Sequence, residues 1–314
     1  MAGELEITLT DAHGAPVDPL DWLPMCRLFG LAAGREPVHA TFWLLEAPDS
    51  LAQQSRREPD GTGLGYYDAR GRPVVSKQPM AAYEDREFAH EAKEIDSHTF
   101  VAHVRYASTG GLSARNTHPF EQEGRLFAHN GVIEDLDRLE AELGEDMSLV
   151  TGDTDSERFF ALITREARRS GDLGGGIAAA ARWVAENLPL FAINLLLITE
   201  SDLWALRYPD THDLFVLERS AGGAGGDRHL EHSSPRASVR VRSGDLASRP
   251  AVVVATEKMD EDPGWAPLAS GELLHVDGDL RVTRRTVIER PPAHPLTLAD
   301  LGQKAAASQA PQTH

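Results

Sequence analysis

The sequence predicts an α+β fold, a sandwich built from largely antiparallel β-sheets with helices packed against them. Strand-like segments come first, two helical segments follow, and strand-like segments then return, an order typical of this class. Many strands are separated by short connections, which disfavours a doubly wound parallel sheet with a helix in every crossover. No phosphate-binding fingerprint stands at a strand-to-helix junction, because Gly174-Gly175-Gly176 lacks the Lys-Ser/Thr pair that would have to follow it.

The segments before the helices are short, apolar and rich in Val, Phe, Tyr and Gly. We expect strands at 26–33, 61–68, 72–77, 98–107 and 126–133. The second and third of these form a hairpin that turns at 68–71. The strand 126–133 is interrupted by the pair Asn130-Gly131, and the stretch 50–58 is polar and helical or looped.

Two helices are expected next, over 155–170 and 173–188, the second ending before Pro189. Six further strands follow the helices, at 192–199, 203–208, 214–218, 238–241, 251–256 and 273–276. The segment 220–236 is a Gly-rich loop of mixed charge, and 305–314 has the composition of a disordered tail.

The composition excludes several classes of function. The 314 residues carry 49 acidic and 31 basic side chains, a formal net charge of -18, which argues against binding to nucleic acid or anionic lipid. A single cysteine cannot form an intramolecular disulfide, and no apolar run is long enough to span a membrane. Residues 1–24 contain no Lys or Arg and no apolar core, unlike a secretory signal, so we expect a cytoplasmic protein.

Each chemically interesting residue also has a purely structural interpretation when it is taken alone. Cys26 lies among apolar residues, as a small core side chain does, and Asn130-Gly131 is a good turn dipeptide. The segment 154–157 matches a capping box at a helix start. Arg105 is less ordinary, because a guanidinium in an apolar strand needs a partner, either a structural carboxylate or the carboxylate of a ligand.

Metal and serine-hydrolase chemistry find little support in the sequence. His103, His118 and His129 fall on or near strands, but no His-Glu-x-x-His helix and no Cys/His zinc spacing accompanies them. No Gly-x-Ser-x-Gly elbow is present either. We therefore expect core histidines, no metal site and no cofactor.

Six motifs, read in order, resemble the class II glutamine amidotransferases, which are N-terminal nucleophile hydrolases. They are Met25-Cys-Arg-Leu-Phe-Gly30, Asp60-Gly-Thr-Gly63, His103-Val-Arg-Tyr106, Asn116-Thr-His-Pro-Phe120, His129-Asn-Gly131 and Gly152-Asp-Thr-Asp-Ser-Glu157. The resemblance continues more loosely to Asp262-Pro-Gly-Trp265. It implies a four-layer αββα sandwich, and the chain looks closest to short, stand-alone members such as the amidohydrolase of ergothioneine biosynthesis and the glutathione-degrading amidase.

The resemblance also implies a role for each site residue. Cys26 is the nucleophile, its own α-amino group is the general base, and the Asn130 side chain with the Gly131 amide stabilises the oxyanion. Arg105 binds the α-carboxylate of a small-molecule substrate, glutamine or a γ-glutamyl compound, and Asp155 binds its α-ammonium group. Three further residues line the pocket, namely Thr117, His118 and Ser108.

Two alternatives stay open at this point. One is a glutaminase subunit that supplies ammonia to a separate synthase partner, and the other is a catalytically silent relative that serves as a binding module. The start of the chain departs from the family pattern, because 24 residues precede Met25 and an amide nitrogen at Cys26 cannot act as a base. We expect an N-terminal extension at 1–25, either a mis-set start or a propeptide, an amidotransferase domain at 26–290 and a tail at 291–314.

Overall fold

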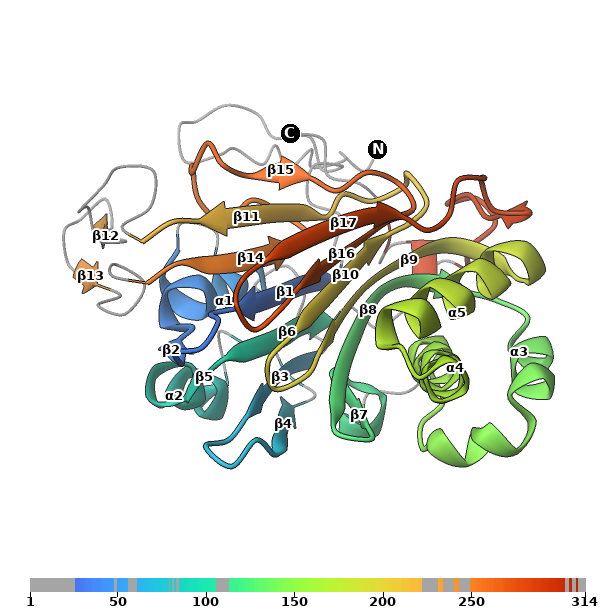
Figure 1. Ribbon diagram of the computed structural model, residues 1–314, viewed down its shortest axis with the longest axis horizontal. Coiled ribbons are helices and arrows are strands. Elements are labelled where there is room, and N and C mark those ends of the chain that lie inside the picture. The colour runs from blue at the N-terminus through green and yellow to red at the C-terminus, as the bar shows by residue number, and fades with distance from the viewer. Residues whose placement is uncertain are drawn as a thin grey trace, which may run out of the picture.

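The computed structural model describes residues 26–47, 50–55, 61–78, 80, 82, 85–105, 113–221, 231–233, 240–242, 249–302, 305–306 and 309 (Figure 1). The expected N-terminal extension at 1–25 and the predicted pocket residue Ser108 lie outside the described residues. So do residues 56–58, most of the loop 220–236 and most of the tail 305–314.

The first sheet has β1, the strand that follows Cys26, at its centre. Within the described part of the chain it has seven antiparallel strands. In spatial order these are β15 (Ala266–Pro267), β11 (Phe215–Arg219), β14 (Ala251–Ala255), β1 (Arg27–Ala32), β6 (Thr99–Arg105), β3 (Gly61–Tyr67) and β4 (Pro73–Gln78). The predicted hairpin is confirmed, with Tyr67 opposite Pro73 and the Asp68 amide donating to the Arg72 carbonyl at 3.0 Å.

The second sheet lies against the first. Its strands, in spatial order, are β17 (Val282–Thr286), β16 (Glu272–Val276), β10 (Leu203–Arg207), β9 (Pro189–Ile198), β8 (Arg125–Ile133) and β7 (Phe120–Gln122), and β18 (His294–Pro295) pairs in parallel with the start of β9. Two small ribbons complete the strands of the described residues, β2 (Val38–His39) with β5 (Asp96–Ser97) and β12 (Glu231–Ser233) with β13 (Arg240–Arg242).

Helices cover the outer face of each sheet, which makes four layers and confirms the predicted fold class (Figure 1). On the second sheet these are α3 (Leu136–Leu143), α4 (Asp155–Ser170) and α5 (Leu173–Asn187), with a 3₁₀ turn at Gly144–Leu149. On the first sheet they are a π-helical turn at Phe42–Glu46, α1 (Leu51–Gln54) and α2 (Arg86–Glu94). Successive side chains of β1 point to opposite faces of the sheet, so Leu28 packs in the core between the sheets and Phe29 packs against the outer helices.

The pair Asn130-Gly131 does not break a strand, so the turn interpretation was wrong. β8 runs without interruption through both residues, with Asn130 opposite Asn194 and Gly131 opposite Ile193 on β9. The need for glycine at position 131 is steric, because a Cβ atom there would overlap the carbonyl group of Ala192. A close approach between neighbouring strands therefore requires the glycine here.

Candidate active site

Cys26 lies immediately before β1 and is only 7% exposed. The side-chain amide of Asn130, on β8 of the other sheet, donates a hydrogen bond from Nδ2 to the Cys26 carbonyl oxygen at 2.9 Å. This bond brings together two of the residues that the sequence predicted to act as a pair. It also joins β8 of the second sheet to the backbone of Cys26, just before β1 of the first.

Asp155 is held close to the same stretch of β8. It is the first residue of α4, is 3% exposed, and accepts the backbone N–H of Ile133 at Oδ2 over 2.9 Å. Ile133 lies two residues beyond Gly131, so the start of α4 is fixed to the strand that carries the predicted oxyanion donors. The carboxylate also lies at a helix N-terminus, where the helix dipole favours negative charge.

The capping prediction at 154–157 is confirmed in its first half. The hydroxyl of Thr154 accepts the N–H of Glu157 at 3.2 Å. The Glu157 side chain does not turn back to the cap residue and instead accepts the backbone N–H groups of Thr151 and Gly152. Thr154 therefore caps α4, and Glu157 holds the preceding loop. The carboxylate of Asp155 is left to contact β8.

His129 is a core histidine with partners, as the sequence predicted. Its Nδ1 lies 3.0 Å from the Ser156 hydroxyl and its Nε2 lies 3.4 Å from the Ala192 carbonyl oxygen. Burial lowers the pKa of His129, so the ring is neutral near neutral pH. Ser156 in turn lies 3.3 Å from Asp155, so the ring helps to fix the first turn of α4.

Thr117 and His118 are buried in the segment that leads into β7. The Thr117 hydroxyl donates to the Ser113 carbonyl at 3.0 Å, and the His118 ring lies 4.2 Å, centre to centre, from the ring of His103 on β6. The His118 carbonyl is seated directly on β3, where a Cβ atom at Gly63 would overlap it. The His118 backbone thus packs directly against the last glycine of the 60–63 motif.

A second link joins the 116–120 motif to the 152–157 motif. The Asn116 side chain accepts the N–H of Asp153 at Oδ1 over 3.0 Å, and its Nδ2 lies 3.4 Å from the Asp153 carboxylate. Two motifs that are separate in sequence therefore form one loop cluster beside the start of α4.

Arg105 is placed by its backbone. It ends β6 opposite Gly61 of β3, and the preceding residue, Val104, lies opposite Arg27 of β1. The register therefore puts Arg105 and Cys26 in the same row across neighbouring strands. The Arg105 side chain lies outside the described residues, as does Ser108.

Arg27 is a site neighbour that the sequence reasoning missed. Its side chain is fully buried and forms an ion pair with Glu257, two residues beyond the end of β14, over 2.6 Å between Nη2 and Oε1. The next residue of β1, Leu28, donates its N–H to the Thr256 hydroxyl at 3.3 Å. A signal was present, because an arginine between Cys26 and the apolar run that follows is as unusual as Arg105 in its own strand.

His212 is a buried ring on the loop between β10 and β11. Its backbone carbonyl accepts Nδ2 of Asn194 at 3.3 Å, and Asn194 is the cross-strand neighbour of Asn130. The ring Nε2 lies 2.8 Å from the Gln309 side chain. Burial, above all, lowers the pKa of His212 from 6.5 to about 4.

This shift predicts a loss of stability in acid. Below pH 6.5 the unfolded chain gains a proton on His212, whereas the folded protein gains it only near pH 4, so the free energy of unfolding falls across that window. We expect urea unfolding to show that the wild type loses roughly 2 kcal/mol more than H212N between pH 7 and pH 5. The exposed control H294N should keep the wild-type pH dependence, and equal slopes for H212N and wild type would contradict the assignment.

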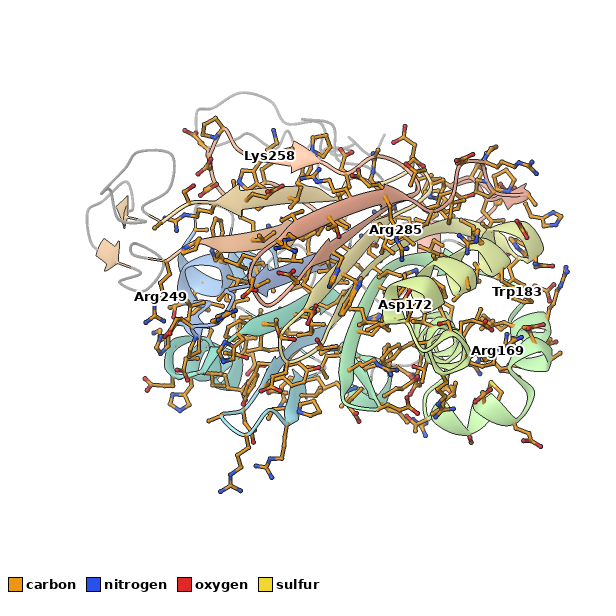
Figure 2. All side chains as sticks on the ribbon, viewed as in Figure 1. Arg169, Asp172, Trp183, Arg249, Lys258 and Arg285 are labelled. Carbon is orange, nitrogen blue, oxygen red and sulfur yellow. The ribbon has the colours of Figure 1, made fainter. Side chains whose placement is uncertain are left out.

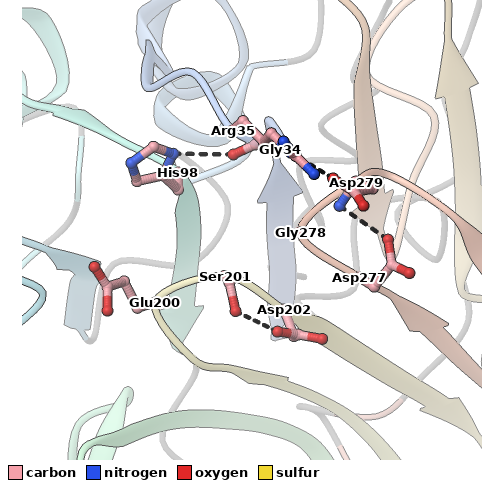
Figure 3. Close-up of a pocket in the computed structure, with 9 residues that line it drawn as sticks. All are labelled: Gly34, Arg35, His98, Glu200, Ser201, Asp202, Asp277, Gly278 and Asp279. Carbon is pink, nitrogen blue, oxygen red and sulfur yellow. Dashed lines mark hydrogen bonds and ion pairs between the residues drawn. The ribbon is translucent and has the colours of Figure 1, made fainter.

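A cavity of about 520 Å³ lies at the other end of β1 (Figure 3). Its lining includes Gly34, Arg35 and His98 together with the turns at 200–202 and 277–279. Cys26 precedes the first residue of β1 and Gly34 follows the last, so the cavity is separate from the site around the thiol. No cluster of three or more His, Cys, Asp or Glu residues suited to a metal ion, and no helix able to cross a membrane, occurs within the described ranges.

Comparison with known proteins points to one family. The family described as "Glutamine amidotransferases class-II" matches residues 25–297. The chain is 31% identical over 160 residues to a Saccharomyces cerevisiae protein named "Probable glutamine amidotransferase DUG3", which covers 44% of each chain. It is 30% identical over 159 residues to the glutamine–fructose-6-phosphate aminotransferase of Idiomarina loihiensis, which covers 50% of this chain and 25% of that protein. The chain therefore matches less than half the length of either relative.

Solved structures share the fold. The glutamine phosphoribosylpyrophosphate amidotransferase of B. subtilis superposes with a TM-score of 0.58 at 20% identity, over 85% of this chain and 50% of that one. A glutamine aminotransferase class-II domain protein from Silicibacter pomeroyi superposes with a TM-score of 0.54 at 18% identity, over 83% of this chain and 99% of that one. Both likenesses concern the four-layer sandwich.

Proposed function

Because the chain belongs to the class II glutamine amidotransferases, we propose that it hydrolyses the side-chain amide of glutamine or of a γ-glutamyl compound with Cys26 as nucleophile. The observation that carries this proposal is the hydrogen bond from Asn130 Nδ2 to the Cys26 carbonyl, which joins the proposed oxyanion donor to the proposed nucleophile. We also propose that the chain belongs with the short, stand-alone members of this family. We favour a stand-alone γ-glutamyl amide hydrolase.

The reaction begins with a proton transfer that needs a free amino group on Cys26. A thiol with an ordinary pKa near 8.5 gives its proton to an α-amine with an ordinary pKa of about 7.7–8.0, and the thiolate attacks the amide carbonyl carbon. The tetrahedral intermediate collapses, the C–N bond breaks, and the nitrogen leaves with the proton as ammonia or an amine. Water then attacks the γ-glutamyl thioester, which releases glutamate and the thiol.

In our proposal the oxyanion forms between Cys26 and Asn130 of β8. An asparagine side-chain amide has two N–H donors, and one of those of Asn130 is directed to the Cys26 carbonyl. In our proposal the second donates to the oxyanion together with the Gly131 amide. The bond to Cys26 fixes the orientation of the Asn130 amide before substrate binds, as electrostatic preorganisation requires.

The amino-acid head of the substrate needs one cation and one anion. Arg27 is committed to its buried ion pair with Glu257, which supports Arg105 as the group that binds the α-carboxylate. Asp155, buried at the start of α4, is proposed to bind the α-ammonium group. Thr117, His118 and Ser108 are proposed to line the remaining wall. A site of this kind selects a free amino acid head over a peptide.

The test uses protein that begins at Cys26, incubated with glutamine, γ-glutamyl methylamide and γ-glutamyl p-nitroanilide. We expect release of glutamate in equal amount to the amine, and stoichiometric labelling of Cys26 by the glutamine analogue 6-diazo-5-oxonorleucine. C26S should show neither turnover nor labelling. Turnover that appears only after a synthase is added would favour an ammonia-supplying subunit, and absence of both turnover and labelling would indicate a catalytically silent relative.

A further inference from the structure

Lys77, on the edge strand β4, reaches across to the segment that carries two of the proposed pocket residues. Its Nζ donates to the carbonyl oxygens of Thr117 at 3.0 Å and of Pro119 at 3.2 Å. The same Nζ lies 5.1 Å from the centre of the Phe120 ring. One ammonium group thus contacts three of four successive residues at the entry to β7.

The carbonyl between the two that Lys77 binds is held from the other strand of the hairpin. The His118 carbonyl rests on Gly63 of β3, where no side chain could be accommodated. Pro119 packs in the same way over Gly65, because a Cβ atom there would lie 2.9 Å from Pro119 Cγ. Both strands of the β3–β4 hairpin therefore contact the backbone of residues 117–119, β4 through Lys77 and β3 through Gly63 and Gly65.

The ammonium group of Lys77 is partly buried where it holds this segment. Burial lowers the pKa of Lys77, which shows that desolvation opposes its charge, and the carboxylate of Glu157 in the first turn of α4 partly offsets this effect. The contacts that compensate are hydrogen bonds from a charged donor, which are stronger than neutral ones. An apolar side chain of the same length would leave both carbonyls without this donor.

We propose that Lys77 is a positioning residue for the reaction, which sets the Thr117–Pro119 backbone and through it the pocket wall formed by Thr117 and His118. This inference rests on the proposed function. His118 is the side chain most directly affected, because its ring is packed on His103, and Gly63 pairs with His103 in the sheet. The contacts of Lys77 Nζ are with the Thr117 and Pro119 carbonyls and the Phe120 ring, so we expect its effect to fall on substrate binding.

The test compares kinetics of K77M, K77R and wild type, all beginning at Cys26. We expect KM for glutamine to rise roughly tenfold in K77M with kcat changed less than about threefold, because the wall moves but the nucleophile and oxyanion donors do not. K77R, which keeps a charged donor, should recover most of the lost kcat/KM. K77Q, which keeps a polar end without the charge, provides the second variant if K77M does not fold.

The matched control is K258M. Lys258 also lies over an aromatic ring, with Nζ 5.4 Å from the centre of Phe215, but at the far side of the first sheet from β4 (Figure 2). K258M should keep the wild-type KM. If wild type is active and K77M or folded K77Q keeps its KM, or if K77R is as impaired as K77M, the inference about Lys77 is overturned while the proposed function stands. If wild type neither turns over nor is labelled, the proposed function fails and this inference fails with it.

Discussion

A chain that begins at Cys26 is expected to hydrolyse glutamine at least 100-fold faster than the chain of 314 residues. The nitrogen of Cys26 is an amide while Met25 precedes it, and an amide has no basic lone pair to accept the thiol proton. Cleavage after Met25 creates an amine and therefore the proposed general base. Steady-state glutamate release, measured beside the intact mass of each preparation, checks this prediction.

A single added residue makes the sharpest control. A protein with one alanine before Cys26 keeps the thiol and almost the same fold but has an amide nitrogen at the critical position. It should be as slow as the full chain. Full activity in a preparation whose mass retains residues 1–25, or in the alanine-extended protein, would remove the α-amine from the mechanism.

Replacement of Asn130 by alanine is expected to lower kcat for glutamine by about 100- to 1,000-fold with a small change in KM. The variant loses the proposed donor to the oxyanion and also the hydrogen bond to the Cys26 carbonyl. N130D should be at least as slow, since its carboxylate offers no donor and repels both the Cys26 carbonyl oxygen and the oxyanion. Single-turnover kinetics with γ-glutamyl p-nitroanilide will show whether thioester formation is the step that slows.

The control for Asn130 is another asparagine, in the helix layer on the outer face of the second sheet. Asn187, at the end of α5, bonds through its side chain to Arg138 and to the Trp183 carbonyl, and N187A should keep the wild-type kcat. Thermal unfolding of N130A has to be measured in parallel, because Asn130 is buried. A folded N130A with wild-type kcat would refute the oxyanion assignment.

Local signals were sufficient for most of the fold. The bounds of α4 were predicted to the residue, because Thr154 provides a cap before it and Gly171 adopts the left-handed conformation after it. The strands of both sheets were largely found from their short apolar runs. Among the α-helices of the described residues, α2 and α3 were not predicted; both are short and rich in charged residues, so their apolar stripes are narrow.

The proposed active site could be inferred from the sequence only through the order of the motifs. The turn propensity of Asn130-Gly131 is real, but pairing with β9 overrode it, and no local rule reveals that Ala192 would approach so closely. The Arg27–Glu257 ion pair and the Lys77 contacts join residues far apart in sequence. Such partners depend on which strands become neighbours, which a single sequence does not specify.

The hydrogen bond between Asn130 and the Cys26 carbonyl has a mechanical consequence. The proposed nucleophile belongs to one sheet and its proposed oxyanion donors to the other, so neither half of the sandwich holds a complete reaction centre. Sliding of one sheet over the other by a fraction of a residue would separate the thiol from its donors while every strand stayed paired. If the proposed mechanism holds, we expect turnover to fall with misalignment of the two sheets before spectroscopic signals of secondary structure change.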